Sequence, residues 1–364
     1  MAYSDIKDPS AYFQTVIWTG NSGSNVNVVN DGNSDLQPDF IWAKERTSPG
    51  GYDYNHNLVD SSRGVTKTIW IDTTDAEKTA TQSNYDLQSF NTDGFTTGAP
   101  EYTNSLGGSN VTDGKVAWQW KANGGTTSTN SDGDINSTVQ VNQDAGFSIV
   151  TYQPSNTTAR NIGHGLGATP GVIIIRNRTR IENPRFWHHS LGAGGAILDN
   201  TSTYNTGTST LVNTVTSTTF NVGSDFSVNG GYPIVAWCWA EKQGYSKFGT
   251  YKGNGDANGP FVYTGFKPAF VLIKNTSATE SWVMYDTKRN PSNPVDLKLS
   301  PDTANAENDN SGIGGAAYNN IDILSNGFKC VKNNAATNGS GNTLMYMAFA
   351  EHPFVAEGVP TTAR

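Results

Sequence analysis

The chain has 364 residues and a formal net charge of −8 at pH 7, and only 15% of its residues are charged. Average soluble domains hold roughly 25% charged residues, so hydroxyl and amide side chains must supply much of this surface. The acidic balance and the lack of any run of Lys and Arg argue against a nucleic-acid-binding protein, whose phosphate contacts need clustered cations. No apolar stretch approaches a membrane span, and residues 1–7 lack the apolar core of a signal peptide. We therefore expect a soluble protein that is made in the cytoplasm and inserts into no membrane.

The composition is that of a folded, turn-rich β protein. The chain contains 39 Gly and 15 Pro, but also 9 Trp, 15 Tyr and 15 Phe. Disordered chains lack such an aromatic content, because aromatic side chains drive the burial of apolar surface. The length allows two or three domains, each with its own core.

Three diverged copies of one unit account for most of the chain, and a repeat of this kind decides the fold assignment. Each copy has a proline followed by an apolar run, with Pro38, Pro170 and Pro268 in the same register. Each copy also closes with a strand in which large and small apolar residues alternate. The closing strands are expected at Val116-Ala117-Trp118-Gln119-Trp120, Val235-Ala236-Trp237-Cys238-Trp239 and Met347-Ala348-Phe349-Ala350-Glu351.

The predicted organisation is all-β, with three tandem β-sandwich repeats of jelly-roll or lectin-like type and very little helix. The copies span residues 11–122 (repeat 1), 145–242 (repeat 2) and 243–352 (repeat 3). Polar segments with Pro or Gly separate and flank them. We expect an N-terminal arm at 1–10, a linker at 123–144, within which residues 135–141 alternate like a strand, and a loose C-terminal tail at 353–364.

The first strand is expected from Phe13 to Trp18, and a second strand follows Pro38. A proline suits this position because at the start of a strand it removes no ladder hydrogen bond. The second strand is apolar on both faces, which predicts burial on both sides. The basic residue near its end is expected to mark the point where the strand reaches solvent; these residues are Lys44, Arg176 and Lys274.

Turn signals come next in each copy. Asp93-Gly94 and Asn326-Gly327 predict hairpins in repeats 1 and 3, whereas repeat 2 lacks such a dipeptide and should differ there in loop length or turn type. Segments 73–80 and 302–308 are the short helix-like pieces, with one turn each at most.

The closing strands carry the largest side chains. Trp118 and Trp237 alternate with small residues, which favours a core face over a sugar-stacking face. The two cysteines, Cys238 and Cys330, lie in different repeats and are expected to be free, buried thiols rather than a disulfide.

Taken together, these segments resemble a repeated domain of virion structural and tail-fibre-type proteins of marine tailed bacteriophages. The resemblance covers about Ala11 to Pro353. It implies a virion component, and it brings no defined active site. It rests on Phe13-Gln14-Thr15 with Trp18-Thr19-Gly20-Asn21, Asp93-Gly94-Phe95, Asn326-Gly327-Phe328, Ala145-Gly146-Phe147-Ser148-Ile149-Val150 with Gly163-His164-Gly165-Leu166-Gly167, and the Val-Ala-Trp-x-Trp strands.

No motif indicates a metal, a cofactor or a catalytic site. His188 and His189 would point to opposite faces of a strand and so could not readily share a metal; they and His56, His164 and His352 are expected to be ordinary loop and surface residues. A glycosidase needs two facing carboxylates, and the spacing of the acidic residues singles out no such pair. The segment 302–309 is interpreted as a solvated acidic turn rather than a calcium loop.

Loop aromatics are the candidate receptor-binding residues, because binding residues concentrate on loops that a rigid scaffold holds. The alternative is that each of these rings folds back on its own domain. The candidates are Tyr52, Tyr54, Tyr102, Trp187 and Tyr204.

The sequence thus predicts a non-enzymatic bacteriophage virion protein, of tail-fibre or receptor-binding type, on the exterior of the particle. Its expected partners are other virion proteins, engaged through the N-terminal arm, and a host cell-surface glycan, and it is expected in several copies or as a homo-oligomer. A capsid decoration or head-fibre protein is one alternative. A carbohydrate-binding lectin or glycan-cleaving enzyme is the other.

Overall fold

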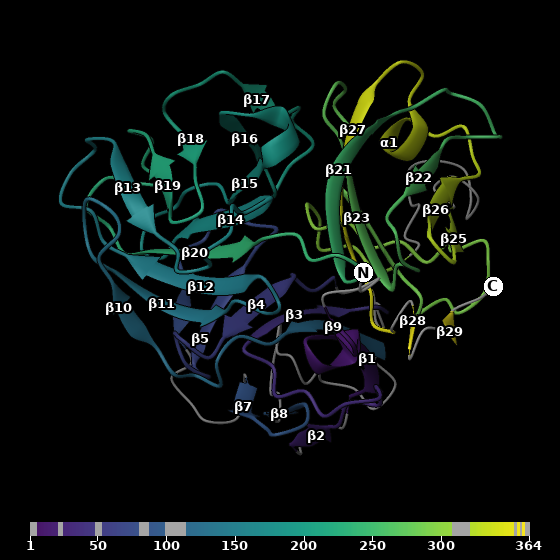
Figure 1. Ribbon diagram of the computed structural model, residues 1–364, viewed down its shortest axis with the longest axis horizontal. Coiled ribbons are helices and arrows are strands. Elements are labelled where there is room, and N and C mark those ends of the chain that lie inside the picture. Colours follow the sequence, from purple (N-terminus) through teal and green to yellow (C-terminus); the bar gives the residue numbers. More distant parts are fainter. Residues whose placement is uncertain are drawn as a thin grey trace.

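The computed structural model describes residues 6–20, 25–47, 53–79, 87–98, 114–307 and 321–352, with two short strands beyond them. Three lobes surround a common centre (Figure 1), with repeat 1 below in purple and blue, repeat 2 at the left in teal and repeat 3 at the right in green and yellow. The all-β prediction is confirmed, since the described residues hold many antiparallel strands and one α-helix, α1 (Ala335–Asn338).

One order of four strands occurs in each repeat. The first strand of the repeat pairs with the closing strand, the closing strand pairs with the proline strand, and the proline strand pairs with the strand after it. We call these four-stranded units the inner sheets. They are β1 (Phe13–Thr19), β9 (Gly114–Trp120), β3 (Phe40–Glu45) and β4 (Asn57–Asp60); β12 (Phe147–Tyr152), β20 (Ile234–Trp239), β14 (Val172–Asn177) and β15 (Arg185–His188); and β21 (Ser246–Lys252), β27 (Thr343–Phe349), β23 (Phe270–Asn275) and β24 (Val283–Asp286).

The register is also the same in the three sheets, so the three prolines occupy equivalent positions as predicted. Each proline lies two residues before its strand, and the next residue's N–H donates to the last carbonyl of the closing strand, at 2.8, 2.7 and 2.7 Å. Phe40 pairs with Trp120, Val172 with Trp239 and Phe270 with Phe349. The predicted third closing strand is therefore wrong by two residues: Phe349, not Glu351, corresponds to Trp120 and Trp239.

A smaller outer sheet packs on each inner sheet over a separate apolar cluster. In repeat 2 the segment Gly194–Ile197 connects the two layers, because Ala196 pairs with Phe186 of the inner sheet and Gly194 pairs with Val212 of the outer strands. The two layers therefore form one continuous sheet there. The outer strands are β2 (Val26–Val28), β8 (Phe95–Thr97) and β7 (Leu87–Phe90); β13 (Arg160–Gly163), β19 (Thr219–Val222), β18 (Val212–Val215), β16 (Gly194–Ile197) and β17 (Asn205–Thr206); and β22 (Phe261–Tyr263), β26 (Gly327–Cys330) and β25 (Ile321–Leu324).

Several connecting segments differ from expectation. The interval 123–144 contains β10 (Ser128–Asn130) and β11 (Ser137–Asn142), and β11 lies where residues 135–141 were expected to alternate like a strand. Because β11 pairs with β12, this interval extends the sheet of repeat 2 rather than only linking two repeats. The described parts of 73–80 and 302–308 are not helical, because their backbones bond to a neighbouring repeat. The other elements are β5 (Lys67–Trp70), β6 (Lys78–Thr79), β28 (Val355–Ala356), β29 (Val359–Pro360) and the 3-10 turns η1 (Pro9–Ala11) and η3 (His189–Leu191).

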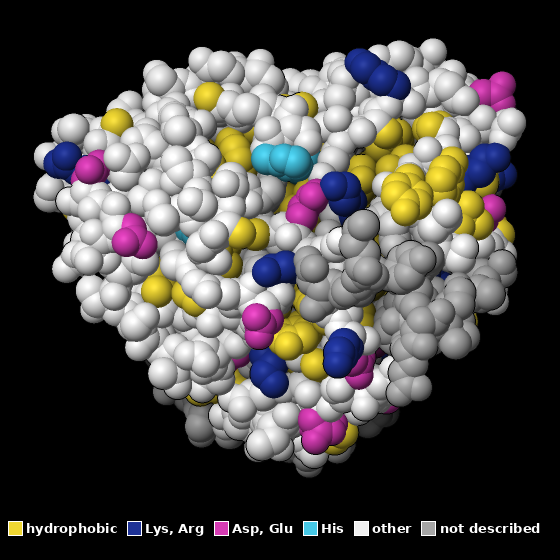
Figure 2. Space-filling model, in the orientation of Figure 1, with side chains coloured by type: hydrophobic (Ala, Val, Ile, Leu, Met, Phe, Trp, Pro, Cys, Tyr) yellow, Lys and Arg dark blue, Asp and Glu magenta, His cyan; other side chains and the backbone are white. Residues whose placement is uncertain are grey.

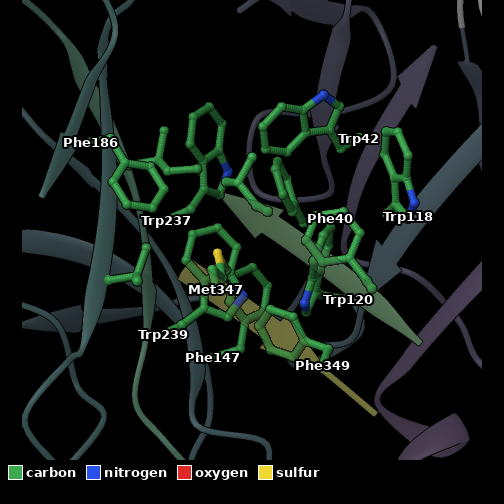
Figure 3. Packing of buried hydrophobic residues seen from close by; sticks show 14 of the residues in the cluster. Phe40, Trp42, Trp118, Trp120, Phe147, Phe186, Trp237, Trp239, Met347 and Phe349 are labelled. Atoms are coloured by element: carbon green, nitrogen blue, oxygen red, sulfur yellow. The ribbon is translucent and has the colours of Figure 1, made fainter. Parts of the chain in front are cut away.

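The inner sheets turn one face toward each other and share an aromatic core (Figure 3), in which side chains from all three repeats converge. Trp118 and Trp237 are fully buried, as predicted. The ring of Phe40 in repeat 1 lies 5.1 Å from Trp237 in repeat 2, between centroids, and Trp120 lies 5.4 Å from Phe349 in repeat 3. No repeat completes this core alone, because each contributes only one of its walls.

The expectation of a free arm is wrong for residues 6–10. Ile6 is buried in the shared core. Asp8 caps η1, accepting hydrogen bonds from the N–H and Oγ–H of Ser10 at 3.1 and 2.7 Å. A segment fixed in this way adds to stability, so removing it would expose apolar surface.

Candidate binding surface

Buried polar groups join the repeats to one another. Asp60 of repeat 1 accepts a hydrogen bond from Trp237 Nε1 of repeat 2 at 3.0 Å. Asp286 of repeat 3 accepts one from Trp118 Nε1 of repeat 1 at 3.1 Å. At the third junction His188 Nε2 donates to the carbonyl of Tyr346 at 3.2 Å. Each repeat thus contacts the next, and the third contacts the first, in a closed ring.

The two aspartate junctions each also hold a buried arginine. Arg63 donates to Asp60 Oδ2 at 2.6 Å and Arg289 to Asp286 Oδ2 at 2.5 Å, and both guanidinium groups are fully buried. The Asp60 and Glu77 carboxylates hold the pKa of Arg63 above its usual value against the opposing effect of burial. Removing one partner of such a buried ion pair leaves an uncompensated charge, so each of these two junctions depends on both residues.

Two equivalent glutamates extend this network between repeats. Glu77 accepts from Arg63 and, through both oxygens, from Arg178 of repeat 2 at 2.8 Å. Glu307 accepts in the same way from Arg46 of repeat 1 at 2.8 and 3.0 Å. The segments around these glutamates, interpreted from the sequence as helix-like or solvated, are therefore extended contacts between repeats.

The basic residues of the proline strands are buried, which corrects the expectation that they reach solvent. Burial lowers the pKa of Lys44 and Lys274 to about 8 and that of Arg176 to about 10. Lys274 Nζ donates to the carbonyl of Thr201 in repeat 2 at 2.9 Å, and Arg176 donates to the carbonyl of Asp75 in repeat 1. The sequence does not show that the rest of the fold covers these cations, nor that Lys274 and Arg176 contact a neighbouring repeat.

Three of the five histidines are not ordinary surface residues, whereas His189 and His352 are exposed as expected. His56, His164 and His188 are fully buried, and burial lowers the pKa of His188 to about 3 and that of His56 well below its usual value. His56 Nε2 bonds to the carbonyl of Ser300 at 3.1 Å, across the junction of repeats 1 and 3. Within the described residues, no group of three or more His, Cys, Asp or Glu side chains is placed to hold a metal ion.

The predicted receptor-binding aromatics do not come together at one surface. Trp187 and Tyr204 are buried, 5% and 6% exposed, and both donate to the carbonyl of Gly192, at 2.9 and 3.1 Å. Tyr54 is half-buried, with Lys115 Nζ 5.8 Å from the centre of its ring. Tyr52 and Tyr102 lie outside the described residues. Trp187 and Tyr204 thus fold back on their own repeat, which was the alternative interpretation.

The exposed aromatic surface lies instead on β22. Phe261 is 46% exposed and Tyr263 65%, while Val262 between them is buried. Hydrophobic side chains gather over this part of repeat 3 (Figure 2, upper right). Beside Tyr263 lies a hollow of about 410 Å³, bounded by the junction segment 241–247 and by residues 263–265.

A second hollow, of about 610 Å³, lies beside β10 and β11 in repeat 2. Its walls carry amides, hydroxyls and one acid, and Gln143 Nε2 donates to the carbonyl of Gly165 at 2.9 Å across it. Groups of this kind bind hydroxyl-rich ligands such as sugars through directional hydrogen bonds. The polar lining residues are Asn123, Ser128, Thr129, Asn130, Asn142, Gln143 and Asp144.

Sequence reasoning missed β22, although a signal was present. Phe261 and Tyr263 alternate with Val262, so the strand has no polar face at all. A short strand with two apolar faces is either covered on both sides or exposes aromatic rings. The structure shows that the rings are exposed.

Comparison with known proteins identifies a family for this chain but no structural relative. A family model described as a domain of unknown function (DUF7483) matches residues 8–353, across all three repeats. The chain belongs to the DUF7483 family. No curated protein and no solved structure matches the chain. In the described part of this family member, no helix is long and apolar enough to cross a membrane.

Proposed function

We propose that this DUF7483 protein is a non-catalytic structural component of a bacteriophage particle, of the tail-fibre or receptor-binding type, displayed on the exterior of the virion. The closed ring carries the proposal. The interior acids, arginines and histidines described above are held in contacts between repeats. In these contacts they stabilise the ring and are not exposed as reactive groups. A rigid scaffold that presents loops and hollows suits attachment.

The segments that resemble phage virion proteins also support the proposal. The two Val-Ala-Trp-x-Trp strands are β9 and β20, whose tryptophans form the shared core. The resemblance therefore involves the residues that close the ring, rather than scattered surface positions.

The amide-rich hollow of repeat 2 is the proposed contact for a host cell-surface glycan. Asp144 adds one acceptor, and no described Lys or Arg lines this hollow, which favours a neutral sugar over a sulfated or phosphorylated one. On a glycan array, the protein should bind neutral glycans, and Gln143→Ala combined with Asp144→Ala should remove that binding. Ser202→Ala, an exposed hydroxyl elsewhere in repeat 2, should leave it unchanged.

The location is tested on purified particles of a phage that encodes this chain. Mass spectrometry should detect the protein in washed particles, and immunogold labelling should place it at the tail. Label on the head would favour a capsid decoration protein instead. Recovery only in the soluble fraction of infected cells, or release of reducing sugar from array glycans, would contradict the proposal.

A further inference from the structure

The open edge of β22 differs from the equivalent edge in repeat 2. Both strands are the outer edge of their small sheet, and both place a buried residue opposite a phenylalanine: Val262 pairs with Phe328 and Ile162 with Phe220. Phe261 therefore corresponds to Asn161, and Tyr263 to Gly163. The two edges can therefore be compared position by position.

In both strands the inward hydrogen bonds belong to alternate residues. Cys330 N donates to the carbonyl of Pro260 at 3.1 Å, and Thr264 N donates to that of Asn326 at 3.0 Å. Because hydrogen-bonded and non-hydrogen-bonded pairs alternate along an antiparallel ladder, Phe261 and Tyr263 direct their N–H and C=O groups away from β26. The edge of β22 thus offers two donors and two acceptors.

In repeat 2 the same outward groups are satisfied by the chain itself. Asp134 N donates to the carbonyl of Asn161 at 2.8 Å, and Asp134 Oδ2 accepts from Asn161 N at 2.7 Å. Ile135 forms a parallel bridge with Ile162 and packs on the outer core. Gly133 allows this approach, since a Cβ there would lie 2.2 Å from the carbonyl oxygen of Asn161.

In repeat 3 no described residue occupies that place along Phe261 and Tyr263, and both side chains are exposed. Around this edge lysines outnumber acids, by three to two, although the chain carries a net charge of −8. Lys329 lies opposite Phe261 on β26, and Lys242 and Lys247 line the hollow at the Tyr263 end. The acids nearby are Glu241, which pairs with Lys247, and Asp322, which lies opposite Lys329.

We propose that the edge of β22 is a strand-addition site for an extended acidic peptide segment of a partner protein. The segment would run along β22 as residues 133–135 run along β13, with a small residue, an acid and an apolar residue in succession. Its carboxylate would accept from Phe261 N, its backbone would pair with the outward groups, and its continuation would enter the hollow beside Tyr263. Main-chain pairing gives such sites affinity, and the flanking pockets and charges give selectivity.

Hydrogen exchange tests the premise without any partner. The amide of Asn161 should be protected and that of Phe261 should exchange rapidly, although the two positions are equivalent. Protection of Phe261 in the free protein would show that the edge is already occupied and would overturn the proposal.

Binding is tested by panning a displayed library of random twelve-residue peptides against the full-length protein. Enriched peptides should contain an acid followed by an apolar residue, and their binding should protect the Phe261 and Tyr263 amides. Phe261→Pro removes an outward donor and no bond to β26, so it should weaken binding at least tenfold. Phe261→Ala retains the donor and should weaken binding only a few-fold.

The Phe261→Pro protein should melt within a few degrees of the parent, and Tyr263→Pro provides a second proline variant if it does not. Equal losses for Phe261→Ala and Phe261→Pro would indicate ring stacking, as on a glycan, and would contradict strand addition. Failure to enrich any peptide that distinguishes the parent from both proline variants would also contradict it.

Discussion

The junctions between repeats are of two kinds. Where repeat 1 meets repeat 2, and where repeat 3 meets repeat 1, an aspartate accepts from a tryptophan of the next closing strand and binds an arginine three residues later. Where repeat 2 meets repeat 3, Met347 occupies the tryptophan position and His188 the aspartate position. Leu191 stands where the other copies have arginine.

The substitutions at this third junction are physically consistent with one another. The side chain of Met347 has no N–H group that could donate to a carboxylate. A buried aspartate at position 188 would therefore lack this hydrogen-bond partner. His188 instead donates through Nε2 to a backbone carbonyl and accepts at Nδ1 from Ser190 N at 3.2 Å. These two bonds fix a neutral tautomer that needs no arginine. One position in a repeat can therefore change from ionic to neutral provided that its neighbours change with it.

The largest effect is expected from removing a ring of the shared core. Trp237→Ala should lower the free energy of unfolding by about 3–5 kcal/mol, as for other buried aromatics, and it also leaves Asp60 without the indole donor. Chemical denaturation measures the change. Trp70→Ala is the control, because Trp70 is half-buried at the end of β5; similar losses for the two would refute a core shared by all repeats.

The two kinds of junction should differ when their acceptor or donor is removed. Asp60→Ala leaves the Arg63 guanidinium buried beside Glu77 alone and should cost about 3 kcal/mol. His188→Ala removes a neutral hydrogen bond and should cost about 1 kcal/mol. Denaturant titration at pH 7 measures both losses of unfolding free energy. A larger loss for His188→Ala than for Asp60→Ala would contradict the expected difference between the two kinds of junction.

Acid should weaken the His188 junction, and a His188 variant separates this contribution from that of His56, whose pKa burial also lowers. The pKa of His188 is lowered from 6.5 to about 3 by burial, so the unfolded chain binds its proton more readily than the folded one. The contribution of His188 is fully present above pH 6.5 and is lost as the pH falls from 6.5 toward 3. The melting temperature of His188→Gln should therefore fall less over this range than that of the parent, and parallel curves would contradict the assignment.

The smallest effect is expected at the rim of the ion-pair network. Arg178 is 24% exposed at its side chain, whereas Arg63 on the same glutamate is fully buried. Solvent-exposed pairs contribute little, so Arg178→Ala should cost about 0.5 kcal/mol, and less at high salt. Arg63→Ala is the matched comparison. An equal loss of unfolding free energy in the two variants would show that solvent exposure does not determine how much each arginine contributes.

Much of the local structure could be predicted from the sequence. The period of two in the closing strands identified the buried face of Trp118 and Trp237, and the prolines gave equivalent strand starts, because backbone geometry alone fixes both signals. The third closing strand was misplaced by two residues, since its alternation continues through Ala350 and a shift by two preserves the face. Pairing with Phe270 resolves that ambiguity.

The sequence by itself determined an all-β chain of three similar units with aromatic core faces, since side-chain alternation and turn residues act over a few neighbouring positions. The tertiary structure decided that these units close into a ring, that Lys44, Arg176 and Lys274 are buried, and that Phe261 and Tyr263 remain exposed. Burial depends on residues far away in the chain, such as Asp60 and Trp237, which are 177 positions apart. A contact of that kind leaves no periodic trace in either segment.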